Sequence, residues 1–143
     1  MGLVRLFVVL AIAVASTSLG TAAAASCIQE DLAAKAARAE TVVHGRVSGL
    51  EGQAAGGPGR YAQVEVLRVL KGSAASRIGV ALGPEAGGGP GPAVVTSIDY
   101  RVEAGSEHTL FLRRVTPAGF ATDGCSGSHP GGPTPEETAL FGP

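Results

Sequence analysis

The chain has 143 residues, which is enough for one domain of ordinary size. Its 11 basic and 12 acidic side chains leave a net charge of −1, so it lacks the excess of basic residues that nucleic-acid-binding proteins use. With 2 Tyr, 4 Phe and no Trp, it also offers few rings on which bases could stack. We therefore expect no nucleic-acid partner.

Residues 1–25 have the pattern of a cleavable signal peptide. Arg5 supplies a positive charge, residues 6–15 form an unbroken apolar run, and small residues follow as far as Ala25. The apolar run is about ten residues long, half of the roughly 20 that a membrane-spanning helix needs. The sequence therefore predicts a protein secreted from the cell, with no transmembrane segment in its mature chain.

The end of this segment allows two cleavage sites. Cleavage after Ala25 leaves Ser26 at the new N-terminus, and cleavage one residue later leaves Cys27 there. Residues 24–27 also resemble a degenerate lipoprotein signal, in which Cys27 would carry a lipid. The alternative to a secreted protein is therefore one that is lipid-anchored on the outer face of the cell membrane.

The chain contains two cysteines, Cys27 and Cys125, which lie near the two ends of the expected domain. In an exported protein an even number of cysteines favours a disulfide, and two cysteines allow one intramolecular pairing. Two unpaired thiols are an alternative. Lipidation of Cys27 is another, and it would leave Cys125 without a partner. We favour the disulfide.

In chain order, the mature sequence begins with an Ala-rich segment that predicts a short helix over residues 30–40. A β-branched, alternating segment predicts a strand over 41–47. In the next expected strand, Ala62, Val64 and Val66 alternate with polar residues, and the apolar phase then changes at Leu67. Such a change predicts a β-bulge or a sharp bend. We expect the strands after the first at 60–70, 77–82, 94–102, 107–115 and 120–122.

Gly- and Pro-rich loops separate these strands at 52–59 and 83–92. Residues 130–143 are rich in Gly, Pro and acidic residues and predict a disordered tail. Many short strands with one helix indicate a mainly β domain built on a closed antiparallel sheet.

The order of five segments resembles a known family. They are VVHGRV at 42–47, VEVLRVLKG at 64–72, YRVEAG at 100–105, TLFL at 109–112 and CSGS at 125–128. Together with Cys27, they resemble the bacterial secreted relatives of the tissue inhibitors of metalloproteinases, over about residues 27–128. The resemblance implies a netrin-like OB-fold domain over 26–129, which is a small five-stranded Greek-key barrel.

The resemblance also implies a role for the N-terminus. In the inhibitors, the amine and carbonyl of the N-terminal cysteine chelate the catalytic zinc of the target protease. This makes Ser26 and Cys27 the candidate partner-facing terminus, and the chemistry requires cleavage directly before Cys27. The family usually begins with Cys-x-Cys, whereas here Cys27 stands alone. We expect a monomeric, non-catalytic domain that binds an extracellular protein or an envelope component, with protease inhibition as the specific hypothesis.

Other chemistry finds little support in the sequence. His44, His108 and His129 lack the spacing of a metal site. The serines of the 125–128 segment lack the G-x-S-x-G pattern of a nucleophile elbow. The Gly-rich loops carry no Lys-Ser/Thr and do not open a helix, so they do not predict a phosphate site. We therefore expect no enzyme activity, no metal and no cofactor.

Overall fold

A computed structural model describes residues 27–52, 61–83, 99–117 and 119–143. The predicted signal peptide, Ser26 and the first part of the strand expected at 94–102 lie outside these residues. Residues 99–102 are described and do not form a strand. No helix in the described ranges is long and apolar enough to cross a membrane.

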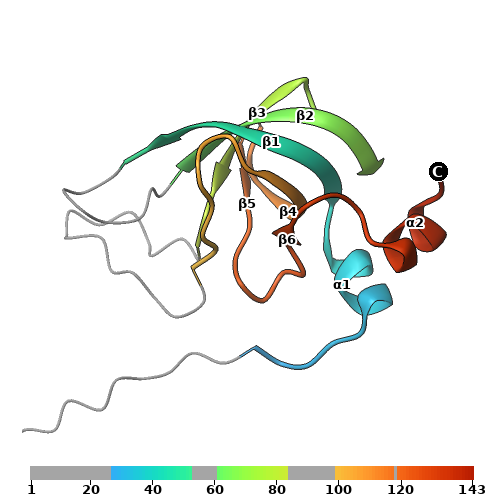
Figure 1. The fold of residues 1–143 in the computed structure, drawn as a ribbon. Helices are drawn as coiled ribbons and strands as arrows, with labels where there is room; N and C mark the ends of the chain where they lie inside the picture. Colours follow the sequence, from blue (N-terminus) through green and yellow to red (C-terminus); the bar gives the residue numbers. More distant parts are fainter. Residues whose placement is uncertain (1–26, 53–60, 84–98, 118) are drawn as a thin grey trace, which may run out of the picture.

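The fold is a closed barrel, and Figure 1 shows its strands wrapped around one interior. The strands are β1 (Thr41–Glu51), β2 (Tyr61–Lys71), β3 (Arg77–Ala81), β4 (Glu107–Thr116) and β5 (Gly119–Ala121). They pair in the order β1-β2-β3-β5-β4, and β4 pairs with β1 to close the barrel. This confirms the mainly β, small OB-like barrel.

The expectation of a wholly antiparallel sheet is wrong for one pair of neighbouring strands, because β3 and β5 pair in parallel. A short sixth strand, β6 (His129–Pro130), pairs with the start of β4. The barrel is therefore mixed.

The bulge that the sequence predicted in the second strand is present at Leu67. His44 pairs with Arg68 and the next residue of β1, Gly45, pairs with Val66, so Leu67 is the extra residue on β2. In β2 the inward phase of Ala62 and Val64 continues without a change, while Leu67 and Val69 stay 43% and 39% exposed. The pairing of β1 with β2 shifts register at three places, with the extra residue on β2 at Leu67 and Leu70 and on β1 at Ser48. Because β1 pairs with both β2 and β4, these irregularities supply the coiling that closure requires. At Gly45 the two strands approach so closely that a Cβ would lie 2.5 Å from Val64 Cγ1.

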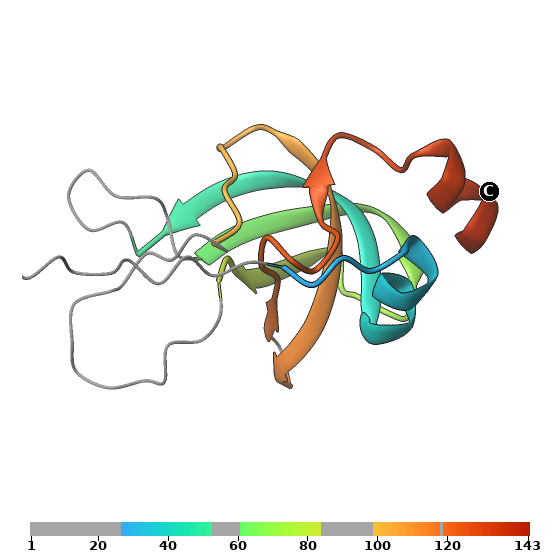
Figure 2. The same cartoon turned by 90° about the horizontal axis from the view of Figure 1, so that it is seen from below.

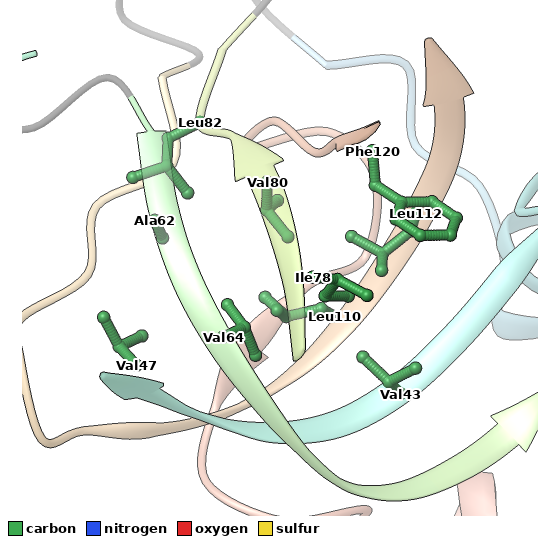
Figure 3. Packing of buried hydrophobic residues seen from close by; sticks show 10 residues of the cluster. All are labelled: Val43, Val47, Ala62, Val64, Ile78, Val80, Leu82, Leu110, Leu112 and Phe120. Atoms are coloured by element: carbon green, nitrogen blue, oxygen red, sulfur yellow. The ribbon is translucent and has the colours of Figure 1, made fainter. Parts of the chain in front are cut away.

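Two apolar clusters hold the structure together. The interior of the barrel is filled from all five of its strands, as Figure 3 shows. Its buried members are Val43, Val47, Ala62, Val64, Ile78, Val80, Leu82, Leu110, Leu112 and Phe120. The second cluster lies where helix α1 (Leu32–Arg38) packs on the barrel, and it centres on Phe111 and Val42.

The prediction of a disordered tail over 130–143 is wrong, because the tail contains helix α2 (Pro135–Phe141). Thr134 and Glu137 cap its start reciprocally, and Pro135 stands where a helix tolerates a missing N–H. The ring of Phe141 lies 6.2 Å from that of Phe111, which attaches the helix to the second cluster. Figures 1 and 2 place both helices at the same end of the barrel.

Candidate functional site: the disulfide-pinned N-terminal segment

The disulfide between Cys27 and Cys125 is present, with the two Cα atoms 5.2 Å apart and 98 positions apart in the chain. This confirms the predicted pairing. It conflicts with the lipid-anchored alternative, because a thioether-linked lipid needs the sulfur of Cys27, and that sulfur is bonded to Cys125. The bridge joins the first described residue to the loop between β5 and β6.

The segment 27–31 is held at both ends. At its start the disulfide fixes Cys27. At its end the Glu30 carboxylate pairs with Arg38 Nη1 at 2.6 Å, and the Asp31 carboxylate accepts from Ala34 N–H as the cap of α1. Arg38 also donates to the carbonyl of Cys125 at 3.0 Å. The same guanidinium therefore contacts Glu30 in the N-terminal segment and Cys125 in the loop to which the disulfide joins that segment.

Between these fixed points, Ile28 is 84% exposed, more than any other large apolar side chain that the structure describes. Figures 1 and 2 show the segment as an extended blue stretch without regular secondary structure that leads into α1. The side chain at position 28 is therefore an apolar group presented to solvent by a segment whose backbone is restrained.

A pocket of about 260 Å³ lies beside the disulfide, between α1 and the strands β4 and β5. Phe111, Leu112 and Ala121 give it an apolar lining. Its basic groups are Lys35 and Arg38 from α1 and Arg113 from β4. Nothing in the sequence joined these residues into one site, because they come together only when α1 packs on the barrel.

Comparison with known proteins finds no family model that matches the chain, and no curated protein or solved structure with significant similarity.

Among the described residues, Ser106 and His108 form a serine–histidine pair, and the other hydrogen bonds of these two side chains indicate a structural role. The Ser106 hydroxyl lies 2.5 Å from the Glu103 carbonyl, which can only accept, so its proton points there. His108 Nε2, 2.8 Å from Ser106 Oγ, must then donate, which leaves Nδ1 to accept from the Tyr100 hydroxyl at 2.8 Å. In this tautomer the imidazole cannot act as a base toward the serine.

Burial lowers the pKa of His108, and the nearby His129 lowers it further, so the fold favours the neutral ring. Burial also raises the pKa of the Tyr100 phenol, which keeps this donor protonated. The network ties residues 100–106 to the start of β4.

The other two histidines each contact a glutamate, and the carboxylate beside His129 is buried. His44 Nε2 lies 3.1 Å from Glu107, whose carboxylate also accepts from Arg46 at 2.6 Å. The hydrogen bond from Arg46 is the main cause of a lowered Glu107 pKa, with His44 contributing less. His129 contacts the carboxylate of Glu137 at 2.9 Å. Within the described residues, His, Cys, Asp and Glu side chains do not gather in threes as a metal site would require.

The serines of the 125–128 segment support a turn. Ser126 and Ser128 bond to the hydroxyl of Thr122, and Ser128 Oγ also accepts from the backbone N–H of Phe111 in β4. These bonds fix the loop that carries Cys125. The sequence identified both cysteines of the site but missed Ile28, although its position directly after Cys27 was a usable signal.

Proposed function

We propose that the protein is an exported, non-catalytic binding domain that presents Ile28 and its neighbours to a protein partner outside the cell. The observation that carries the proposal is the 84% exposure of Ile28 on a segment pinned by the disulfide and by the Glu30–Arg38 ion pair. The pattern of residues 1–25 supports export, and the disulfide suits an oxidising compartment.

Pinning matters for binding because a restrained segment loses less conformational entropy when a partner orders it. An exposed apolar side chain that enters a partner's pocket is the usual anchor of such an interface. Ile28 is one residue from Cys27, so its backbone has little freedom to withdraw from this position. These features support an inserting role for the segment.

The specific form of the proposal is inhibition of a zinc metalloproteinase. Its support is the resemblance of the sequence to the secreted relatives of the tissue inhibitors, together with the pairing of Cys27 to Cys125. In this form the free amine and the carbonyl of Cys27 would approach the zinc of the protease. It therefore requires that the signal peptidase cut directly before Cys27.

Two mature proteins test the specific form, one beginning at Cys27 and one at Ser26. Each is assayed against a panel of zinc metalloproteinase catalytic domains with a fluorogenic peptide substrate. We expect inhibition by the form that begins at Cys27 and a loss of at least tenfold in the form that begins at Ser26. Equal inhibition by both forms would contradict the amine-chelation route. N-terminal sequencing of the natively exported protein shows which form is made.

Substitution at position 28 tests the broader proposal. Ile28→Asp should abolish binding to a partner isolated with the wild-type domain, because a carboxylate would have to be buried without a counter-charge. Leu67→Asp is the matched control, since Leu67 is also exposed but lies on β2. If the two variants bind alike, the interface does not include the pinned segment and the proposal fails.

A further inference from the structure

The pocket beside the disulfide is lined by two basic side chains that form no ion pair with the rest of the described structure. Among the described residues, neither the ammonium of Lys35 nor the guanidinium of Arg113 has a hydrogen-bond or ion-pair partner, although both line the pocket. Arg38, the third basic group, is already paired with Glu30. The one acidic lining residue, Asp123, accepts from the backbone N–H of Cys125 at 2.8 Å.

The residues are placed by the tertiary structure. Lys35 is on α1, and its stem packs against the backbone at Gly127, where a Cβ would lie 3.2 Å from Lys35 Cδ. Arg113 comes from β4, which lies across the pocket from the helix. Phe111, Leu112 and Ala121 line the same pocket as the two basic residues. A cation beside an apolar lining is screened by less water than one on an open surface.

We propose that this pocket receives the carboxylate side chain of an aspartate or glutamate from a protein partner. The volume of about 260 Å³ is below the roughly 300–1,000 Å³ of pockets that hold whole small-molecule ligands, so it suits a group of side-chain size. The apolar lining fits the methylene groups of such a side chain, and Lys35 and Arg113 supply the charge that its carboxylate needs. This contact is separate from Ile28 and stands whether or not the protein inhibits a protease.

The test uses the full mature protein with its disulfide intact, labelled with ¹⁵N, and follows backbone amide shifts by NMR. The probes are N-acetyl-glutamate methylamide, its glutamine counterpart and propionate, each titrated to about 100 mM. We expect saturable shifts at Lys35, Arg38 and Ser126 with the glutamate probe, and no saturable shifts with the glutamine probe. Equal responses to both probes, or no response to glutamate, would overturn the proposal. If propionate binds as tightly as capped glutamate, the pocket is a site for small organic acids rather than for a peptide.

Variants identify the groups responsible. Lys35→Met and Arg113→Gln should each weaken glutamate binding about three- to tenfold, the effect of one partly exposed charge pair. Asp123→Asn should tighten it, because it removes the negative charge from the lining while keeping an oxygen that accepts from Cys125 N–H. Arg77→Gln is the control, since Arg77 is an exposed arginine on β3 outside the pocket. If Arg77→Gln matches the effect of Arg113→Gln, the binding reflects overall charge and the assigned site is wrong.

Discussion

Removal of the Cys27–Cys125 disulfide should cost a large share of the stability of this domain. The bridge joins residues 98 positions apart. In the chain-entropy model, closing a loop of about that length restricts the unfolded chain by an amount worth about 4.7 kcal/mol at 25 °C. Domains of this size have a free energy of unfolding of only about 5–15 kcal/mol. The double variant Cys27→Ser/Cys125→Ser should therefore unfold at a far lower urea concentration than the wild type.

The assay is equilibrium urea denaturation of both proteins, followed by far-UV circular dichroism. The variant should also show a larger dependence of the free energy on urea concentration, because its unfolded chain is no longer held compact. The wild type measured in a reducing agent is the matched control and should behave like the variant. A loss of less than about 1 kcal/mol would refute the reasoning, since the entropic term would then be absent or offset by strain in the folded protein.

Three further outcomes follow from particular contacts. The pKa of His108 is lowered in the folded protein, so the contribution of this histidine to stability should be complete above about pH 6.5 and should decline as the pH falls below that value. His108→Gln should remove this part of the pH dependence when urea midpoints are compared between about pH 5 and pH 8. Phe141→Ala should destabilise the protein by about 1–3 kcal/mol in urea titrations, because Phe141 attaches α2 to Phe111, and an unchanged midpoint would show that α2 is not coupled to the barrel. Gly45→Ala should lower the melting temperature through about 1–3 kcal/mol of overpacking against Val64, whereas Gly49→Ala, where a Cβ would meet nothing within 4 Å, should not show that loss.

Much of the barrel was predictable because strand formation is a local signal. The alternation of Ala62, Val64 and Val66 identified β2, and the apolar run around Phe111 identified β4. The pairing of Cys27 with Cys125 was also predictable, since two cysteines leave one intramolecular choice and the pattern of residues 1–25 predicted export to an oxidising compartment. These inferences need only the chain itself and the periodicity of the backbone.

The errors have physical causes that the chain does not display locally. Leu67 and Val69 suggested that β2 changes its buried face after a bulge. The bulge is present at Leu67, but both side chains stay partly exposed, because an exposed apolar residue costs little by itself. The tail over 130–143 has the composition of a disordered segment. It folds because Phe141 packs against Phe111, and because Glu137 forms hydrogen bonds with Thr134 and His129. Two of these partners, Phe111 and His129, lie outside the tail.

The candidate site divides in the same way. The sequence by itself placed a cysteine, an isoleucine and an acidic pair directly before the first helix, and it predicted the bridge at that cysteine. Only the tertiary structure decided that Arg38 contacts both Glu30 and Cys125, and that Lys35 and Arg113 share one pocket. The reason is that a strand or a bridge follows from local pattern and covalent chemistry, whereas a pocket exists only where separate elements pack together.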